Sequence, residues 1–452
     1  MATKRSGPVE RLMEKALRPD RFIDYRTSWE FVGGLEEVKR EIDRLIKTQP
    51  HQAVELLETF IAGCYEKAEE IDDSSGSFGM FVGDLFCAWI EARQAAKAAP
   101  HATAKQLLGW MDSDDYGFCH GIEKNAVKAF NKAGLKAFAE VAREEFAKEL
   151  ESVKAREQGD RNTPGSFRFR QLSDVLRAIY AAQQDADGYL ALVEATQLAP
   201  SDCAAIARIY RARRKPHEAL SWVQRGLEIK GDRYFGDGSS YSLAELKRTL
   251  LKSLGNEEEA LDSAWKEFQE HPSEYSYKTL MKYAPEGRRQ EWHAKALIVA
   301  EGASLDDAIA LYVETKEWDR LAELVRRSKP TALEGLSHYT TEPAANKLEK
   351  SHHDAAAMLY RALGLRILNA KKSKYYDAAL DHFDRARRCF GKAGLGKEWE
   401  AMVDHIRSEH HRKAGFIQAF EALLSRGSLP RPQSFLDRAR KRRSHHFRGA
   451  QA

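Results

Sequence analysis

Four short stretches decide the fold: RKPHEAL at 214–220, GNEEEAL at 255–261, KEWDRL at 316–321 and SKYYDAAL at 373–380. In each stretch, a polar turn leads into an acidic residue, and apolar residues follow at the spacing of a helix. Acidic side chains are favourable in the first turn because they interact with the positive end of the helix dipole. Each stretch therefore predicts the start of the second helix of a helical hairpin.

The spacing of these four starts predicts an irregular array. Corresponding positions are 41, 60 and 59 residues apart, whereas a regular tetratricopeptide repeat has a period of about 34 residues. The two longer intervals should contain additional helices. The sequence thus predicts an all-α protein, an irregular α-solenoid of tetratricopeptide-like helical hairpins, whose stacked hairpins present an exposed concave surface.

Helical periodicity also extends through the N-terminal part, where strand signals are nearly absent. Two successive apolar stripes predict a pair of helices, and a third pattern from Ile122 to Phe146 is interrupted at Ala133 and Gly134, which predicts a turn between helices there. The two stripes consist of Ala53, Leu56, Leu57, Phe60, Ile61 and Cys64, and of Phe78, Phe81, Val82, Leu85, Trp89 and Ala92.

Four regions follow from where the periodicity begins and ends. We expect a helical-hairpin region over 1–150, a linker or long loop over 151–170, a tetratricopeptide-like α-solenoid over 171–424 and a basic flexible tail over 425–452. The linker is expected because that stretch is charged, contains a Pro-Gly pair and lacks apolar periodicity.

Charge is separated along the chain. The whole sequence has 72 basic and 68 acidic residues and a net charge of +4, but residues 426–452 alone carry eight basic residues and one acidic residue. That segment has a charge of +7 and the remaining body −3. A basic tail can bind nucleic-acid phosphates, or it can be a solubilising end. The candidate residues for an anionic partner are Arg438, Arg440, Lys441, Arg442, Arg443 and Arg448.

Two acidic loops between predicted helices are candidates for contact with a partner. Asp72 and Asp73 lie in one loop, and Asp114 and Asp115 lie in the next. If the two loops stack, they would form an acidic ridge for a basic partner segment, such as the tail of the chain itself. The alternative is helix capping, because Ser and Asp side chains accept hydrogen bonds from free amides at a helix start and Gly76 can adopt a positive φ.

Motifs for catalysis or cofactors are missing from the sequence. The five cysteines have no CxxC spacing, the sequence has no HExxH, and no phosphate-binding glycine loop follows a strand. Cys119 and His120 are adjacent, but catalytic pairs form in space rather than between neighbours. We therefore predict a protein that is not an enzyme and that uses no cofactor and no metal.

Membrane insertion and secretion are not expected. No run of about 18 apolar residues is present. The first residues, MATKRSGPVERLMEKAL, lack the apolar segment of a secretory signal. These features predict a cytoplasmic location without membrane contact.

Two motifs carry a resemblance to known proteins. EEIDDSSGSFG at 69–79 and DDYG at 114–117 resemble an uncharacterised bacterial family of helical proteins, related to helical segments found behind SWIM-type zinc fingers. The resemblance implies a tetratricopeptide-like fold without an established activity. The CxC and CxH pairs of the zinc finger are absent from this sequence, so its metal site is not carried over.

Helical hairpins and a basic tail lead to two functional hypotheses. The first is a non-enzymatic scaffold or adaptor that binds proteins or peptides on its concave surface. The alternative is a nucleic-acid-associated accessory protein that binds the phosphate backbone through its tail.

Overall fold

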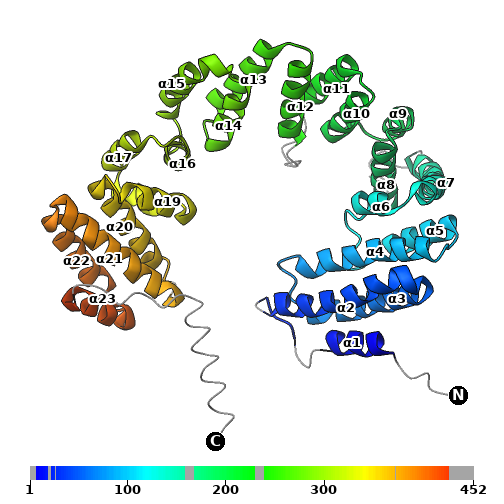
Figure 1. Ribbon diagram of the computed structural model, residues 1–452, viewed down its shortest axis with the longest axis horizontal. Coiled ribbons are helices and arrows are strands. Elements are labelled where there is room, and N and C mark those ends of the chain that lie inside the picture. Colours follow the sequence, from blue (N-terminus) through cyan, green and yellow to red (C-terminus); the bar gives the residue numbers. More distant parts are fainter. Residues whose placement is uncertain are drawn as a thin grey trace, which may run out of the picture. The chain divides into compact units, whose positions relative to one another are not determined.

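The computed structural model describes residues 7–18, 22–25, 27–157, 167–229, 239–371 and 373–426. Within these ranges the chain forms 23 α-helices and three short 3-10 helices, and the single extended pairing is an isolated bridge between Ile23 and Ile71 (Figure 1). The all-α prediction is confirmed. The chain divides into two compact units, Met1–Leu254 and Gly255–Ala452.

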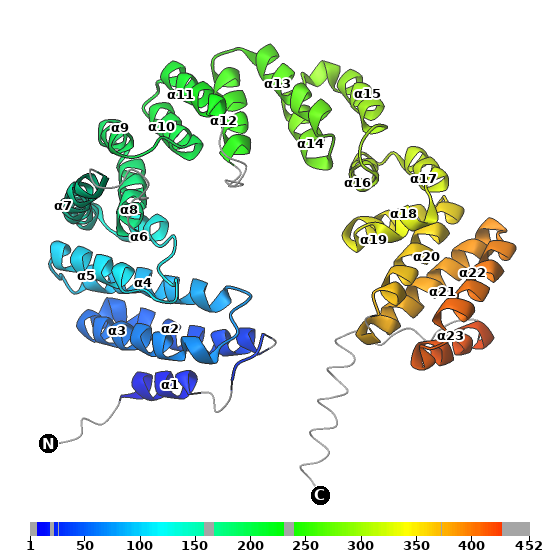
Figure 2. The ribbon, with the colours of Figure 1, turned by 180° about the vertical axis from the view of Figure 1, so that it is seen from behind.

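Unit 1 is built from two layers of helices. Each even-numbered helix packs against the next even-numbered one, from α2 through α4, α6, α8 and α10 to α12, and the odd-numbered helices pack behind them. Figures 1 and 2 show α7, α9 and α11 on one side of this unit and α8, α10 and α12 on the other. The helices are α1 Pro8–Leu17, α2 Ser28–Thr48, α3 Pro50–Lys67, α4 Ser77–Ala95, α5 Pro100–Asp112, α6 Glu123–Ala129, α7 Lys132–Glu157, α8 Phe167–Gln183, α9 Ala186–Ala195, α10 Pro200–Ala212, α11 Pro216–Glu228 and α12 Ser239–Ser253.

Unit 2 is also built from helical hairpins, but its helices do not pack in the regular alternation of unit 1. Helix α14 packs on α16 and α16 on α19, while α20 and α21 form an extensive antiparallel pair. The helices are α13 Glu257–Glu270, α14 Glu274–Tyr283, α15 Arg289–Ala300, α16 Leu305–Thr315, α17 Trp318–Arg327, α18 Pro330–Gly335, α19 His338–Leu348, α20 His353–Asn369, α21 Tyr376–Ala393, α22 Gly396–His410 and α23 Ala414–Arg426.

The four repeat stretches fall where the sequence predicts them. They open α11, α13, α17 and α21, and the small residues Ala219, Ala260 and Ala379 are fully buried against neighbouring helices. The two long intervals contain α14–α16 and α18–α20. The irregular α-solenoid of tetratricopeptide-like hairpins is therefore confirmed.

Proline marks the start of many helices. Because its missing N–H would be unpaired in the first turn anyway, proline is well suited to the first helical position. Helices α1, α3, α5, α10, α11 and α18 each begin with one, including Pro100 and Pro216. Other helices begin with a side-chain cap, such as Ser273 before α14 and Ser304 before α16.

The turn predicted at Ala133–Gly134 lies three residues earlier in the structure, at Phe130–Asn131. Helix α6 ends at Ala129 and α7 begins at Lys132. Asn131 provides the reason, because its side-chain oxygen accepts a hydrogen bond from the backbone N–H of Gly134 at 2.9 Å. Gly134 is therefore part of the first turn of α7, and the turn between the helices is formed by the residues before it.

The stretch expected to be a linker borders two helices that pack together. Helix α7 continues to Glu157, α8 begins at Phe167, and residues 158–166 lie outside the described ranges. Helices α7 and α8 contact each other, and one core cluster runs from Met13 to Ile209 through both sides of the stretch. The boundary between the two compact units follows Leu254.

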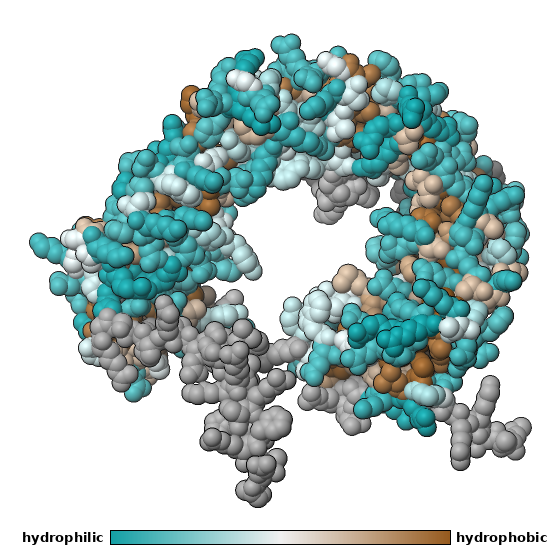
Figure 3. Space-filling model, in the orientation of Figure 1, coloured by the Kyte–Doolittle hydropathy of each residue, from teal (hydrophilic) through white to brown (hydrophobic). Residues whose placement is uncertain are grey.

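The face drawn in Figure 3 is largely hydrophilic, and its apolar patches are small and separate. A few large apolar side chains are nevertheless exposed, among them Trp29, Met80, Ile298 and Tyr339. Among the residues that the structure describes, no helix is long and apolar enough to cross a membrane.

Candidate interaction surfaces

The two acidic loops lie side by side in unit 1. The loop between α3 and α4 contacts the loop between α5 and α6 through Tyr116, whose hydroxyl donates to Glu69 Oε1 at 3.2 Å. Aromatic packing joins them further, because the ring of Phe118 lies 5.5 Å from that of Phe78 and 5.0 Å from that of Tyr65. The two loops thus contact each other, and their role in binding a partner remains a prediction.

Three of the four candidate aspartates hold the loops in shape. The carboxylate of Asp73 accepts hydrogen bonds from the backbone N–H groups of Phe78 and Gly79 at 2.9 and 2.8 Å, which caps the start of α4. The hydroxyl and backbone N–H of Ser74 donate to Asp72, and these hydrogen bonds lower the pKa of Asp72. Gly76 has a φ of +69°, so the capping interpretation describes this loop.

Asp114 has the same structural role in the second loop. Its Oδ1 accepts from the Tyr65 hydroxyl at 2.9 Å and its Oδ2 from the backbone N–H of Cys119 at 2.6 Å. Burial raises the pKa of Cys119 to about 12, with the Asp114 charge adding to the shift. Cys119 is therefore a neutral thiol at physiological pH and a poor nucleophile. Only Asp115 is fully exposed among the four candidates.

The six basic candidates of the tail, from Arg438 to Arg448, lie outside the described residues. Their proposed contact with an anionic partner stays a prediction from the sequence.

A charged groove lies between α2 and α4 in the even-numbered layer of unit 1. It has a volume of about 650 Å³ and is open to solvent. Opposite charges meet in it, and the ammonium of Lys39 lies 2.8 Å from the carboxylate of Asp43. The lining residues are Lys39, Asp43, Arg44, Ile46, Lys47, Thr48, Asp84, Cys87, Ala88 and Glu91.

Cys87 lies in this groove and is half-buried. The apolar residues around it in the sequence predict a small core residue, and that prediction is wrong because its side of α4 faces the groove. The other four cysteines are buried, and all five are free. Burial raises the pKa of Cys87 to about 11, and the charges of Asp84 and Glu91 raise it further while Lys39 and Lys128 oppose them. Charges from α2 and α4 thus line the groove around one half-buried thiol.

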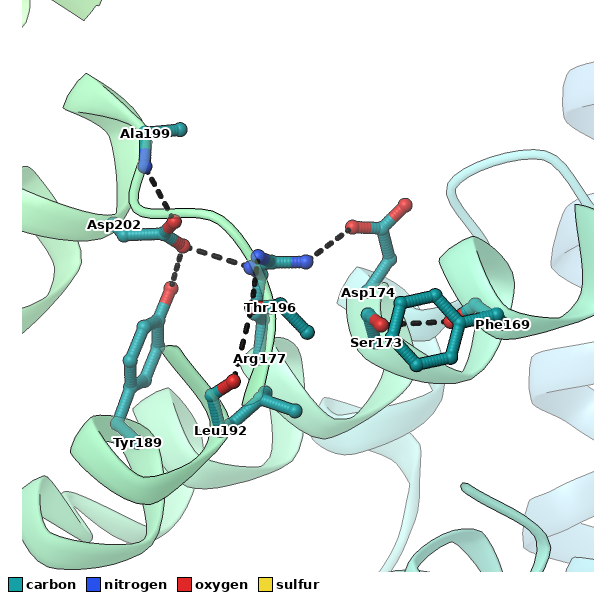
Figure 4. Close-up of polar contacts among 9 residues, drawn as sticks. All are labelled: Phe169, Ser173, Asp174, Arg177, Tyr189, Leu192, Thr196, Ala199 and Asp202. Carbon is teal, nitrogen blue, oxygen red and sulfur yellow. Dashed lines mark hydrogen bonds and ion pairs between the residues drawn. The ribbon is translucent and has the colours of Figure 1, made fainter. Parts of the chain in front are cut away.

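A second cluster of charges joins α8, α9 and α10 (Figure 4). Asp202 Oδ1 accepts from Arg177 Nε at 2.7 Å and from the Tyr189 hydroxyl at 3.0 Å, and Oδ2 accepts from the backbone N–H of Ala199 at 2.9 Å. Arg177 also donates to the Thr196 hydroxyl at 3.2 Å. Because Asp202 is only 1% exposed and both its oxygens are satisfied, the cluster fixes three helices and offers no binding capacity.

The ion pair with Asp202 decides the direction in which the pKa of Arg177 shifts. Burial alone would lower the pKa of Arg177, but the charge and hydrogen bond of Asp202 outweigh it and hold that pKa above its ordinary value. Burial, followed by the Asp202 charge, raises the pKa of Tyr189. Both residues therefore keep their protonation state over the whole physiological range.

The groove is not among the predicted sites, although one face of the predicted helix over residues 77–95 indicates it. On α4, the stripe opposite the apolar core stripe consists of Met80, Asp84, Cys87 and Glu91, spaced i, i+4, i+7 and i+11. A large apolar residue followed by charges on a solvent face differs from an ordinary polar surface. The buried ion pair was also missed, since nothing near Arg177 indicates that Asp202 is its partner.

No arrangement typical of a metal centre is present in the described ranges, because no three His, Cys, Asp or Glu side chains are grouped to hold an ion. The helix layers, the side-chain caps and the open charged groove instead define an all-helical repeat protein of the tetratricopeptide-like class.

The chain belongs to the family of unknown function DUF6880, whose match covers residues 8–419. This agrees with the all-helical family expected from the two loop motifs, while the relation to SWIM-type zinc fingers stays a prediction. No curated protein matches the chain significantly.

One solved structure that matches is described as "Structure of Naa15/Naa10 bound to HypK-THB". It is 13% identical, and the match covers 89% of this chain with a TM-score of 0.26. The chain spans 64% of the length of that chain.

Proposed function

We propose that this protein is a non-enzymatic protein–protein interaction scaffold or adaptor. The observation that carries the proposal is the charged groove between α2 and α4 of unit 1, which is open to solvent. Helical repeat proteins bind partners with such extended surfaces, which need no deep catalytic pocket. The even-numbered layer supplies side chains from successive helices to one partner.

The state of the cysteines supports a binding role. A catalytic cysteine needs a lowered pKa, but burial raises the pKa of Cys87 and Cys203 to about 11 and that of Cys119 to about 12. The same cause raises the pKa of Cys389 to about 11 and also that of Cys64.

Co-purification from native lysate tests the proposal. The intact chain is compared with a full-length variant in which the six basic tail residues from Arg438 to Arg448 are replaced by glutamine, each with and without nuclease. We expect the same protein partners with both chains despite nuclease treatment. Recovery that depends on the tail and disappears with nuclease would contradict the scaffold and support the alternative, a nucleic-acid accessory protein.

A further inference from the structure

Three helices of unit 1 end in a left-handed turn, a conformation that favours glycine. The backbone φ is +57° at Lys97 after α4, +54° at Gln184 after α8 and +59° at Arg214 after α10. Glycine adopts this conformation without steric cost, whereas a residue with a Cβ is strained there. The turn after α12 has Gly255 instead, with a φ of +82°. At Lys97 and Arg214, the chain therefore accepts backbone strain and places a cation in the turn.

These turns lie on the same edge of unit 1. Helix α5 leads away from the α4–α5 turn, and its end lies beside the start of α8, where Gln171 Nε2 donates to the carbonyl of Met111 at 2.7 Å. Helix α8 therefore runs back toward the edge that holds the α4–α5 turn. The ends of α8 and α10 lie together, because Arg213 Nη2 donates to the carbonyl of Gln184 at 2.5 Å.

The helix ends and turns on this edge are mainly basic. The end of α6 belongs to it as well, because Gln94 Nε2 donates to the carbonyl of Ala129 at 2.9 Å. Within the described turns after α4, α6, α8 and α10, the one acidic residue is Asp185, whose carboxylate caps α9 by accepting from the N–H of Gly188 at 3.0 Å. We call this surface the basic edge. Its exposed cations are Lys97, Lys128, Lys132, Arg211, Arg213, Arg214 and Lys215.

The densest group of cations is RARRK at 211–215, where α10 ends. Arg213 is engaged by the carbonyl of Gln184, and Lys215 Nζ lies 3.5 Å from the carboxylate of Glu218. The side chains of Arg211 and Arg214 make no hydrogen bond or ion pair within the described ranges. The helix dipole favours cations at the end of α10, but Arg211 and Arg213 already supply them. Arg214 adds a further charge at a strained position.

The opposite edge of unit 1 is acidic. The loops that contain Asp73 and Asp115 contact each other at the start of α4, whereas Lys97 follows the end of α4. Helix α4 has 19 residues, so the two edges are separated by about 28 Å at the rise of an α-helix. An anionic partner is attracted to the basic edge and repelled by the acidic one, which fixes where it binds.

The basic edge suits an acidic protein segment better than a nucleic acid. Proteins that bind single strands stack the bases on aromatic side chains, and no exposed aromatic side chain lies in the described turns of this edge. Duplex binding depends on an extended basic surface, but the chain before residue 426 has a net charge of −3. A short acidic segment needs only the few cations of one patch.

We propose that the basic edge of unit 1 binds an acidic segment of a partner protein, with Arg211 and Arg214 as its main contacts. This inference rests on the scaffold function proposed above and names a class of partner. The surface is separate from the α2–α4 groove, because none of the cations of the basic edge lines that groove.

Fluorescence anisotropy of a labelled oligoglutamate peptide tests the inference. Every chain is full length and has the six tail residues from Arg438 to Arg448 replaced by glutamine, so that the tail cations do not bind the probe. The test variant combines Arg211→Ala with Arg214→Gly. Glycine adopts the left-handed conformation of residue 214 without strain, so weaker binding cannot be attributed to a distorted turn.

Lys316→Gly is the matched control. Lys316 is exposed and has a φ of +62° in the turn after α16 of unit 2. It therefore undergoes the same change of charge and backbone freedom. Its turn is flanked by Glu314 and Glu317, so it should not attract an acidic peptide.

We expect the oligoglutamate to bind at low ionic strength, and to bind the Arg211→Ala/Arg214→Gly chain roughly tenfold more weakly, as the loss of two exposed charge contacts predicts. Lys316→Gly should bind it unchanged. Equal binding to all these chains, or binding to none, would overturn the basic edge as a binding surface. Protein partners that still co-purify despite nuclease would then leave the scaffold function standing.

Two other occupants of the basic edge are distinguished with the same chains. Tighter binding of an oligothymidylate of equal charge, lost in the Arg211→Ala/Arg214→Gly chain, would identify a nucleic acid and overturn the proposal. Self-association of the chain in light scattering, abolished in that variant, would identify the acidic edge of a second copy as the occupant and would overturn it as well.

Discussion

The helix pair α20–α21 in unit 2 and the pair α2–α4 in unit 1 use a glycine in opposite ways. A methyl group at Gly364 of α20 would lie 2.5 Å from Cζ of the buried Phe383 on α21, whereas one at Gly83 of α4 would meet nothing within 4 Å. The first glycine lets two helices of the chain pack closely. The second has no such partner in the described structure, so the backbone of α4 at Gly83 is not covered by another part of the chain.

Buried and exposed charges show the same contrast. Asp202 is enclosed by hydrogen bonds between three helices, while Asp84 is an exposed residue of the open groove. Their side chains are identical, so burial and hydrogen bonding decide whether a charge supports the fold or remains available to a partner. Five substitutions, one of them a matched control, test how burial decides the role of glycines and of charged or titratable groups.

The largest effect is expected for Asp202→Ala. It leaves the half-buried guanidinium of Arg177 and the Tyr189 hydroxyl without their shared partner, and we expect a cost of up to about 3 kcal/mol, the low end of the range for a fully buried pair. Urea denaturation followed by circular dichroism should show a lower midpoint for unit 1. Asp84→Ala is the matched control and should change the stability by less than about 0.5 kcal/mol. Equal losses of stability for Asp202→Ala and Asp84→Ala would contradict the claim that only the buried aspartate supports the fold.

Gly364→Ala should destabilise unit 2 by about 1 to 3 kcal/mol, because the added methyl group overlaps the ring of Phe383 and the close α20–α21 contact must open. Hydrogen exchange of the α20 amides measures this opening. Unchanged protection of α20 would mean that Phe383 moves aside without cost and that the helix pair does not depend on the glycine.

Gly83→Ala should stabilise the protein, in contrast to Gly364→Ala. The alanine raises helix propensity without a clash, so we expect unit 1 to gain up to about 1 kcal/mol. Thermal unfolding of the full chain provides the measurement. A loss of stability would reveal a contact at Gly83 within the chain and weaken the case for an open binding face.

A smaller, pH-dependent effect is expected from His382 on α21. Burial lowers its pKa, partly offset by the charges of Glu342 and Asp381. The folded state therefore binds the proton less readily than the unfolded state. This contribution to stability is complete above the ordinary pKa of about 6.5 and decreases as the pH falls below it. His382→Gln should reduce the loss of stability between pH 7 and pH 5.5, and identical slopes for both proteins would exclude the effect.

The sequence predicted the fold where local signals and packing agree. The four repeat stretches each combine an acidic first turn with small or apolar residues that become buried, and α11, α13, α17 and α21 begin there. The turn near Gly134 was misplaced because glycine is usually a helix breaker, while the cap formed by Asn131 depends on one side-chain hydrogen bond.

The candidate sites were harder to predict because exposure and pairing are three-dimensional properties. Asp73 and Asp114 look like partner-binding acids in the sequence, but their oxygens are engaged by backbone N–H groups and by a tyrosine. Met80 was within a helix that was correctly predicted, yet its exposure follows from the direction of α4 relative to α2. The groove became evident only when both helices were placed.

Alkylation of Cys87 tests the central claim most directly. It is the one cysteine that is not buried, and it lines the groove beside Asp84 and Glu91. Its reaction with iodoacetamide at mildly alkaline pH can be followed by mass spectrometry in the intact chain, with the four buried cysteines as internal references. We predict that a protein partner recovered by co-purification, added at saturation, slows the reaction at Cys87 alone. An unchanged rate at saturation would contradict the claim that this groove is the binding surface.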